Sequence, residues 1–371
     1  MDPHGPIARR FPLVARFRPA CLPLPDRVAA LVDLSDRAAR QNDPGLASTV
    51  FNQSALLASD IGLPDLARQL CHRHAKAYLN AGPLPAMSAI RGLEPLVNLA
   101  RLQIRAGHPD DARHRLLNLY EAVDTGRPAT FEGITVPADL TQTDQDRREV
   151  RAWLWRVLIA DGTRALTSAG RWAEALAHIE QHHGFGTRML DGRQVAVIAA
   201  LTESDTEQAL ELLASTAPGD PWEQSVTHCL TALCRSEAGQ EVDACLAGLL
   251  NSYLSRQANP GLTVFDVRLG LTALEVAGAP EHPEAGGLVE YMVRRVSDAS
   301  DGYAARELLV HPLATAVMMA KQAQDCSDLL RACALGVGAF VPDDFYADFS
   351  VAMDIAGAVL RRTFASIRNG A

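Results

Sequence analysis

Residues 104–120, IRAGHPDDARHRLLNLY, contain a helix end, a short turn and a helix start in close succession. Gly107 is the type of residue that ends a helix in the left-handed conformation, and Pro109 is favoured in the first turn of the next helix. Ala112 follows Gly107 by five residues, and its small side chain lets the second helix pack closely against the first. The stretch therefore predicts two antiparallel helices joined at Gly107.

The same arrangement recurs along the chain. A glycine or serine at a predicted helix stop is followed five residues later by alanine at five places: Gly62 and Ala67, Gly107 and Ala112, Gly170 and Ala175, Ser204 and Ala209, and Gly239 and Ala244. Successive stops lie 45, 63, 34 and 35 residues apart. One such coincidence carries little weight in an alanine-rich chain, whereas five at predicted turns indicate an internal repeat of helix pairs.

These segments resemble tetratricopeptide repeats (TPRs). The resemblance rests on residues 104–120, on TSAGRWAEALAHIEQ (167–181) and on ESDTEQALELLAS (203–215), which place glycine or serine and alanine at the family's turn and close-packing positions. It covers approximately residues 45–256, and the last two spacings match the family's period of about 34 residues. The resemblance implies stacked helix pairs that hold extended peptides through side chains on their concave face.

The predicted fold class is all-α: a right-handed α-solenoid of stacked antiparallel helix pairs, with one short β-hairpin insertion and a C-terminal capping helix. Residues 1–25 are rich in proline and predict an irregular N-terminal arm that lies on a surface or is mobile. Residues 26–341 predict the TPR-like domain, with an insertion at 125–145. Residues 342–371 predict a helix that seals the last repeat through Phe345, Phe349, Ala352, Ala356, Val359 and Leu360.

The insertion departs from the helical pattern. Its segment ATFEGITVPADL (129–140) predicts two short strands, 129–131 and 134–136, turned at Glu132 and Gly133. An isolated hairpin is marginally stable in water, so its apolar side chains must pack on the helical body. Such a hairpin is either a lid over a groove or a packed surface insertion, and the second interpretation is favoured.

Composition and charge exclude several classes of protein. The chain has 371 residues, 48% of them hydrophobic and 21% charged, which is typical of a folded protein and excludes disorder as a whole. Its net charge of −9 disfavours direct nucleic-acid binding. We find no apolar segment typical of a signal peptide or a membrane span. Only Lys76 and Lys321 are lysines, a bias that indicates a GC-rich bacterial genome such as that of an actinobacterium.

The cysteines and histidines predict neither a metal centre nor a disulfide framework. Seven cysteines, an odd number, are scattered without a CxxC pair, which favours reduced thiols and a cytoplasmic location. His178 and His182 form an i,i+4 pair but lack a third ligand at an identifiable spacing. We therefore expect no metal and no cofactor.

Candidate ligand-binding residues occupy equivalent positions in neighbouring helix pairs. Arg101 and Arg164 each lie six residues before a stop glycine, Asn98 and Asp161 each lie nine before, and Asn52 is one position from the equivalent site in the preceding pair. First helices of stacked pairs line the concave side, and the arginine fork binds carboxylates, phosphates and peptide carbonyls. The alternative is a solvated i,i+3 pair between Asp161 and Arg164.

Two tryptophans, Trp153 and Trp155, point to different faces of one helix, so one can pack in the core while the other lines a groove. Trp155 is taken as the groove residue. The predicted ligand-binding set is therefore Asn52, Asn98, Arg101, Trp155, Asp161 and Arg164.

Two classes of function follow from these residues. The first is a peptide- or protein-binding module, an adaptor or regulator that uses its concave groove and acts on transcription, if at all, through another protein. The second is an accessory enzyme in the maturation of a peptide-derived or other secondary metabolite, with acid–base roles for Asp161, His178, His182 or Tyr303. Scaffolding or homodimerisation through a solenoid face is a third option.

Overall fold

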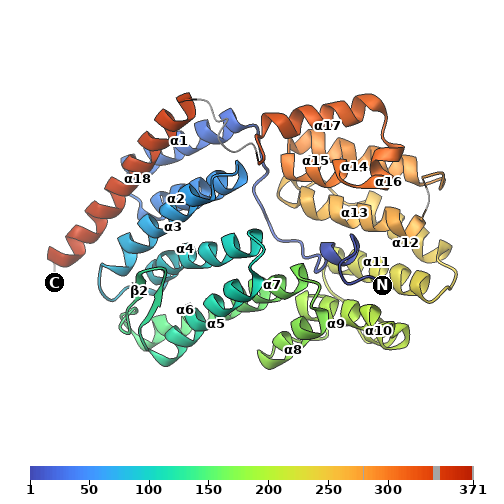
Figure 1. Cartoon of the computed structure of the whole chain (residues 1–371), viewed down its shortest axis with the longest axis horizontal. Coiled ribbons are helices and arrows are strands. Elements are labelled where there is room, and N and C mark those ends of the chain that lie inside the picture. The colour runs from blue at the N-terminus through green and yellow to red at the C-terminus, as the bar shows by residue number, and fades with distance from the viewer. Residues whose placement is uncertain (279, 337–342, 370–371) are drawn as a thin grey trace. The chain divides into compact units, whose positions relative to one another are not determined.

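The chain is mostly helical, with one two-stranded antiparallel sheet among the residues that the structure describes (Figure 1). The structure is a computed structural model that describes residues 1–278, 280–336 and 343–369. The chain folds into two compact units. Unit 1 comprises Met1–Pro23 and Leu166–Cys333, and unit 2 comprises Leu24–Ala165 and Ala334–Ala371.

Unit 2 contains the elements that form the candidate site. Its secondary structure consists of α1 (Leu24–Gln41), α2 (Pro44–Asp60), α3 (Pro64–Leu79), α4 (Ala86–Arg105), α5 (Pro109–Thr125), β1 (Ala129–Phe131), β2 (Ile134–Val136), α6 (Asp144–Val157), the π-helical segment η2 (Leu158–Gly162) and α18 (Asp343–Asn369). The helix α7 (Thr163–Ser168) spans the boundary between the units. Consecutive helices of unit 2 pack against each other from α1 to α6.

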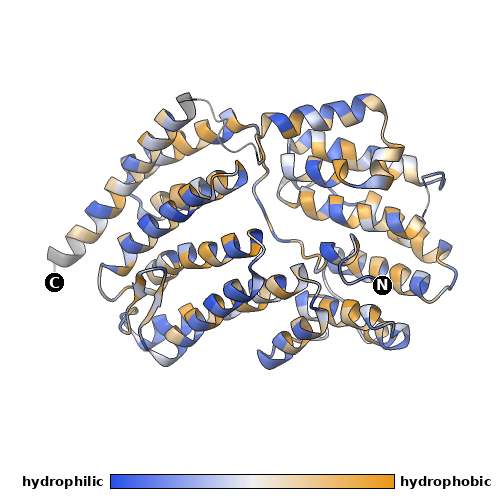
Figure 2. Cartoon of the chain, viewed as in Figure 1, coloured by the Kyte–Doolittle hydropathy of each residue, from blue (hydrophilic) through white to orange (hydrophobic). Residues whose placement is uncertain are grey.

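Unit 1 also consists mainly of helices. Its elements are the 3-10 turn η1 (Ala8–Arg10), α8 (Trp172–Gln181), α9 (Asp191–Thr202), α10 (Thr206–Ala214), α11 (Pro221–Glu237), α12 (Asp243–Leu254), the 3-10 turn η3 (Pro260–Leu262), α13 (Thr263–Ala277), α14 (Ala285–Ala299), α15 (Gly302–Leu309), α16 (Pro312–Val317) and α17 (Ala320–Ala332). Each unit has its own hydrophobic core. Figure 2 shows the corresponding pattern, with polar and apolar residues alternating along most helices.

The predicted helix stops have the backbone conformation that the sequence requires. The left-handed region is occupied at all five of them, with φ between 64° and 84° at Gly62, Gly107, Gly170, Ser204 and Gly239. At Gly107 the next backbone N–H, that of His108, donates to the carbonyl of Gln103 at 2.9 Å, which is the bond of a Schellman motif. These turns satisfy carbonyl groups that a helix end otherwise leaves unpaired.

The alanine of the pattern packs closely in four of the five pairs. Ala67, Ala112, Ala175 and Ala209 are fully buried at the fourth position of their helices. The expectation for Ala244 is wrong, because this residue is exposed. Helix α12 begins four residues after its stop glycine and the other helices begin two residues after theirs, so Leu246 takes the buried position instead.

The C-terminal helix caps a different place from the one expected. Helix α18 packs on α1, α2 and α3, the first helices of unit 2, rather than on the last predicted repeat (Figure 1). Its apolar face agrees with the prediction at Phe349, Ala352, Ala356, Val359 and Leu360, all of which are buried. The side chain of Phe345 lies outside the described residues. The hydrophobic pattern thus predicted the buried face of this helix but not its partner.

The predicted hairpin is confirmed. Strands β1 and β2 pair antiparallel, with Phe131 opposite Ile134, and Phe131, Ile134 and Val136 are buried against the helical body. The turn residues Glu132 and Gly133 both have positive φ, 47° and 78°, as in a type I′ turn.

The tip of the hairpin is attached to two helices by charged groups. The carboxylate of Glu132 accepts hydrogen bonds from Arg68 and His72 on α3 and from Arg115 on α5. Burial alone would raise the pKa of Glu132, but the three donors outweigh it and lower that pKa to about 2. This attachment agrees with a packed insertion rather than a lid.

The N-terminal arm is irregular apart from η1, and it is built into unit 1. The side chain of Gln194 accepts from the backbone N–H of Leu13 at 2.6 Å and donates to its carbonyl at 2.7 Å. Arg10 forms a mostly buried ion pair with Glu275 at 2.7 Å. The arm therefore contributes to the core of unit 1.

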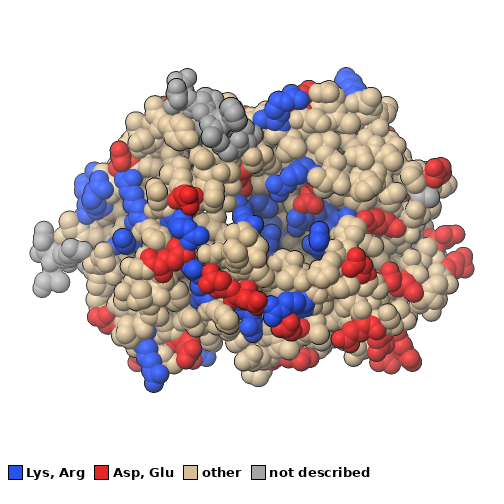
Figure 3. All heavy atoms as spheres, in the orientation of Figure 1, with Lys and Arg blue, Asp and Glu red and all other residues tan. Residues whose placement is uncertain are grey.

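Two further properties of the described residues concern membrane crossing and surface charge. None of the helices in the described part of the chain combines the length and the apolar character that crossing a membrane requires. Figure 3 shows both acidic and basic side chains on the face that it draws, with acidic ones predominating toward its right-hand edge.

Candidate ligand-binding cavity

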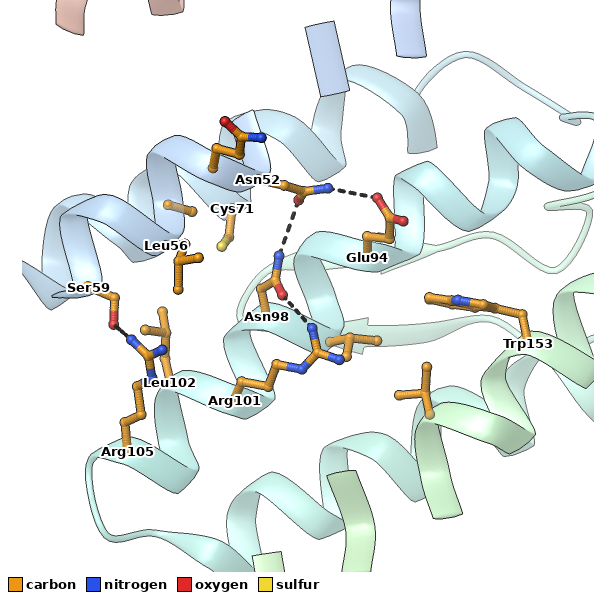
Figure 4. A pocket seen from close by; sticks show the side chains of 14 residues that line it. Asn52, Leu56, Ser59, Cys71, Glu94, Asn98, Arg101, Leu102, Arg105 and Trp153 are labelled. Atoms are coloured by element: carbon orange, nitrogen blue, oxygen red, sulfur yellow. Dashed lines mark hydrogen bonds between the residues drawn. The ribbon is translucent and has the colours of Figure 1, made fainter. Parts of the chain in front are cut away.

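A cavity of about 370 Å³ lies within unit 2, between α2, α4 and α6 (Figure 4). Its volume lies in the range of small-ligand sites. Apolar side chains form part of its lining, and polar groups from two of the helices converge on it. The lining residues are Asn52, Gln53, Ala55, Leu56 and Ser59 of α2, Cys71 of α3, Glu94, Val97, Asn98, Arg101, Leu102 and Arg105 of α4, and Trp153 and Val157 of α6.

Helix α4 supplies a row of polar groups along the cavity. Glu94, Asn98, Arg101 and Arg105 occur at positions i, i+4, i+7 and i+11, which is the spacing of one face of an α-helix. The opposite side of α4 is apolar and buried, as shown by Leu96 and Leu99 of the unit 2 core. The amphipathic pattern of α4 therefore fixes which side chains reach the cavity.

Hydrogen bonds connect this row to α2. The amide nitrogen of Asn52 donates to the Glu94 carboxylate at 2.7 Å, and the amide nitrogen of Asn98 donates to the side-chain oxygen of Asn52 at 3.2 Å (Figure 4). Arg101 donates in turn to the side-chain oxygen of Asn98 at 3.1 Å. Side chains predicted from equivalent positions in neighbouring helix pairs thus form one continuous network.

Arg101 also connects α4 to η2. Its Nε lies 3.2 and 3.1 Å from the two carboxylate oxygens of Asp161, and its terminal nitrogen donates to Asp161 at 2.7 Å. The Asp161 side chain is only 10% exposed, whereas that of Arg101 is 51% exposed. Burial would lower the pKa of Arg101, but the adjacent Asp161 carboxylate raises it, so the guanidinium stays charged.

The π-helical geometry of η2 accompanies this pairing. π-Helical turns are rare and occur frequently at functional sites. Asp161 lies in η2 and pairs with Arg101 of α4, a helix distant in the sequence.

The far end of α4 carries a second guanidinium. Arg105 donates to the hydroxyl of Ser59 at 2.6 Å and to the carboxylate of Asp60 at 3.2 Å. The other oxygen of Asp60 accepts from Arg27 at 2.8 Å. The carboxylate of Asp60 is thus shared between two arginines, and it is almost fully buried.

The remaining predicted residues lie elsewhere. Trp153, rather than Trp155, lines the cavity, and Trp155 is 37% exposed on another face of α6. Arg164 is exposed and is not part of the cavity lining. Asp161 reaches the network through Arg101 without lining the cavity itself.

The lining residues that were not predicted as ligand-binding include Glu94, Arg105 and Trp153. The i, i+4, i+7, i+11 spacing on α4 was the signal for Glu94 and Arg105, because Asn98 and Arg101 already belonged to that face. For Trp153, the i,i+4 spacing with Val157 was the corresponding signal.

The cavity offers limited means for catalysis. Burial raises the pKa of the Cys71 thiol to about 12, so this cysteine is protonated and is not an activated nucleophile. The described part of the chain contains no group of His, Cys, Asp and Glu side chains suited to a metal ion.

Three of the four residues considered for acid–base chemistry, His178, His182 and Tyr303, belong to unit 1. His178 is buried and packs edge-on against His182, with ring centroids 4.8 Å apart. Tyr303 is also buried, and the Arg18 guanidinium lies 3.7 Å from its ring centroid. Asp301 caps α15 by accepting from the Tyr303 N–H at 3.0 Å.

Comparison with family models, curated proteins and solved structures finds no match for this chain.

Proposed function

We propose that unit 2 is a binding module that takes an extended peptide, or an extended segment of a partner protein, in the cavity between α2, α4 and α6. The observation that carries this proposal is the polar network from Glu94 through Asn52 and Asn98 to Arg101 along one wall of the cavity. The module would serve as an adaptor or regulator.

The chemistry of the network suits a peptide backbone. Asparagine amides donate and accept hydrogen bonds, and so do the N–H and C=O groups of an extended chain. Arg101 is already neutralised by Asp161, which favours uncharged carbonyl groups over a free anion at the centre of the cavity. Trp153, Leu56 and Val97 supply apolar surface for side chains of the ligand.

We further propose that the helix pairs are TPR-like and form a right-handed solenoid. Support comes from the left-handed residue at all five stops and from the four fully buried alanines at the fourth helix position. We place the protein in the cytoplasm on the basis of its free cysteines, most of which are buried.

The accessory-enzyme alternative has less support. Cys71, Glu94, Arg101 and Arg105 are the titratable groups of the cavity lining, and Glu94 is bonded to the uncharged amide of Asn52. This set contains no hydrogen-bonded acid–base pair of the type that general acid–base catalysis needs.

A selection experiment tests the proposal. Wild-type protein and the variant Asn52→Ala/Asn98→Ala are used to select from a displayed library of random linear peptides, with Asn118→Ala, an exposed asparagine on α5, as the matched control. We expect wild type and the control to enrich common peptides that the double variant binds at least tenfold more weakly. Enrichment that is unaffected by the double variant, or no enrichment at all, contradicts the proposal. A small metabolite that co-purifies with wild type but not with the double variant would instead support the enzyme.

A further inference from the structure

The charges along α4 change sign from one end of the cavity to the other. Glu94 lies at one end and Arg105 at the other, eleven residues later on the same helix face (Figure 4). At 1.5 Å of rise per residue the two positions are ~16 Å apart along the helix axis. Arg101, between them, is paired with Asp161 and contributes no net charge.

The Glu94 end is suited to a cation. One carboxylate oxygen accepts from the uncharged amide of Asn52 at 2.7 Å, and no hydrogen bond to the other oxygen occurs among the described residues. Glu94 also forms no ion pair with any described residue, so its negative charge is not compensated by direct contact. The indole of Trp153 lies at the same end (Figure 4). A carboxylate beside an aromatic face is a combination that binds ammonium and guanidinium groups.

The Arg105 end is suited to an anion. Its carboxylate partner Asp60 is shared with Arg27, so two guanidinium groups face one carboxylate. The bonds to Ser59 and Asp60 use one terminal nitrogen of Arg105, and the described residues make no hydrogen bond with its Nε or its second terminal nitrogen. These two nitrogens form the fork that binds a carboxylate in a bidentate manner. The side chain is 44% exposed and therefore accessible.

We propose that the cavity selects a bipolar peptide segment, with a basic side chain at Glu94 and Trp153 and an acidic side chain at Arg105. An extended chain spans 3.3–3.6 Å per residue, so ~16 Å corresponds to about five positions. Side chains on one face of an extended chain are an even number of positions apart, so a separation of four positions is the nearest one that presents both charges to α4. The asparagines and Arg101 between these ends face the backbone of the segment. This inference rests on the proposed function, because it names the charge pattern of the peptide that the same cavity would take.

Fluorescein-labelled peptide pools test the charge pattern. Each pool has two fixed charged residues four positions apart in a background of mixed neutral residues, and its peptides carry blocked ends. One pool has Lys before Glu, one has Glu before Lys, one has two Lys and one has two Glu. Both bipolar orders are included because the charges do not fix the direction of the backbone. Fluorescence polarisation gives the Kd of each pool, and we expect one bipolar pool to bind at least tenfold more tightly than both like-charged pools.

Single substitutions assign the preference to its residues. Glu94→Gln keeps an acceptor for Asn52, and it should weaken binding of the preferred pool about tenfold and abolish the advantage of Lys over Glu at that position. Arg105→Gln should abolish the preference for Glu at the other end. Glu149→Gln and Arg148→Gln, exposed positions on α6, are the matched controls and should leave the ranking of the pools unchanged.

The outcomes separate this inference from the proposed function. Equal affinity for bipolar and like-charged pools, or a ranking that Glu94→Gln leaves unchanged, overturns the charge pattern. If those pools still bind and lose affinity in Asn52→Ala/Asn98→Ala, the peptide-binding proposal stands. Failure of every pool to bind overturns both. Should Arg105→Gln not fold because Asp60 loses a partner, Glu94→Gln decides the inference alone.

Discussion

The Arg101–Asp161 pair should contribute unequally to stability when its two members are removed. Replacing Arg101 by alanine leaves the Asp161 carboxylate, 10% exposed, without its ion-pair partner. Breaking a fully buried pair in this way costs about 3–5 kcal/mol. Because the Arg101 side chain is 51% exposed, water partly replaces it, and we expect Arg101→Ala to lower the free energy of unfolding by about 2–3 kcal/mol.

Replacing Asp161 has a smaller effect. The guanidinium that remains in Asp161→Ala is half exposed and can be hydrated, so the expected loss is about 1 kcal/mol. In the double variant no stranded carboxylate remains. We therefore expect Arg101→Ala/Asp161→Ala to be about 1–2 kcal/mol more stable than Arg101→Ala alone.

Hydrogen exchange of peptides from α4 and α6, measured by mass spectrometry in increasing urea, reports the unfolding of unit 2 separately from that of unit 1. Arg147→Ala, which removes an exposed i,i+3 pair with Asp144, is the control and should change stability by less than about 1 kcal/mol. Equal losses for the two single variants, or a double variant less stable than Arg101→Ala, would refute the asymmetry.

Three further predictions concern unit 2 and the helix stops. Glu132→Gln should destabilise unit 2 by about 1 kcal/mol at pH 7, after allowance for solvent screening. Because the folded pKa of Glu132 is lowered from 4.5 to about 2, the stability difference between wild type and Glu132→Gln should persist above pH 4.5 and disappear as the pH falls toward 2. A difference in urea midpoint that is unchanged at low pH contradicts the ion-pair origin. Gly107→Ala places a Cβ at φ 82° in otherwise open space and should lower the free energy of unfolding by about 1 kcal/mol. Ser204→Gly at φ 64° should stabilise unit 1 by a similar amount. Thermal melts that show the reverse signs exclude backbone strain as the cause. Cys71, with a pKa raised to about 12, should resist a thiol reagent at pH 8 until urea unfolds unit 2, and rapid labelling of the native protein would show that it is accessible.

Local features of the fold could be predicted from the sequence. The helix stops depend on single residues whose backbone preferences are strong, and Gly62, Gly107, Gly170 and Gly239 have the predicted conformation. The hairpin bounds also agree, because two turn residues with positive φ between alternating apolar residues determine the register.

Long-range features could not be predicted in this way. The apolar face of α18 indicates that the helix is buried, but it does not indicate that α1, α2 and α3 are the elements that bury it. The division into two units, each with its own core, depends likewise on contacts between distant segments.

The candidate site was predicted in part. Asn52, Asn98 and Arg101 line one cavity, and Asp161 bonds to Arg101, because equivalent positions of neighbouring helix pairs lie side by side. The choice between Trp153 and Trp155 depended on the rotation of α6, which is followed directly by the π-helical turn η2. A π-helical turn has no clear sequence signal, so a count of 3.6 residues per turn does not carry through it.

Protection from hydrogen exchange by a bound peptide tests the central proposal most directly. The tightest peptide from the library is added to the full-length protein, and exchange is compared with and without it. Added protection should appear in residues 52–59, 94–105 and 153–157, and exchange in residues 166–333 should not change. Protection confined to residues 166–333, or a peptide that binds without protecting the walls of the cavity, would contradict the assignment of this cavity as the binding site.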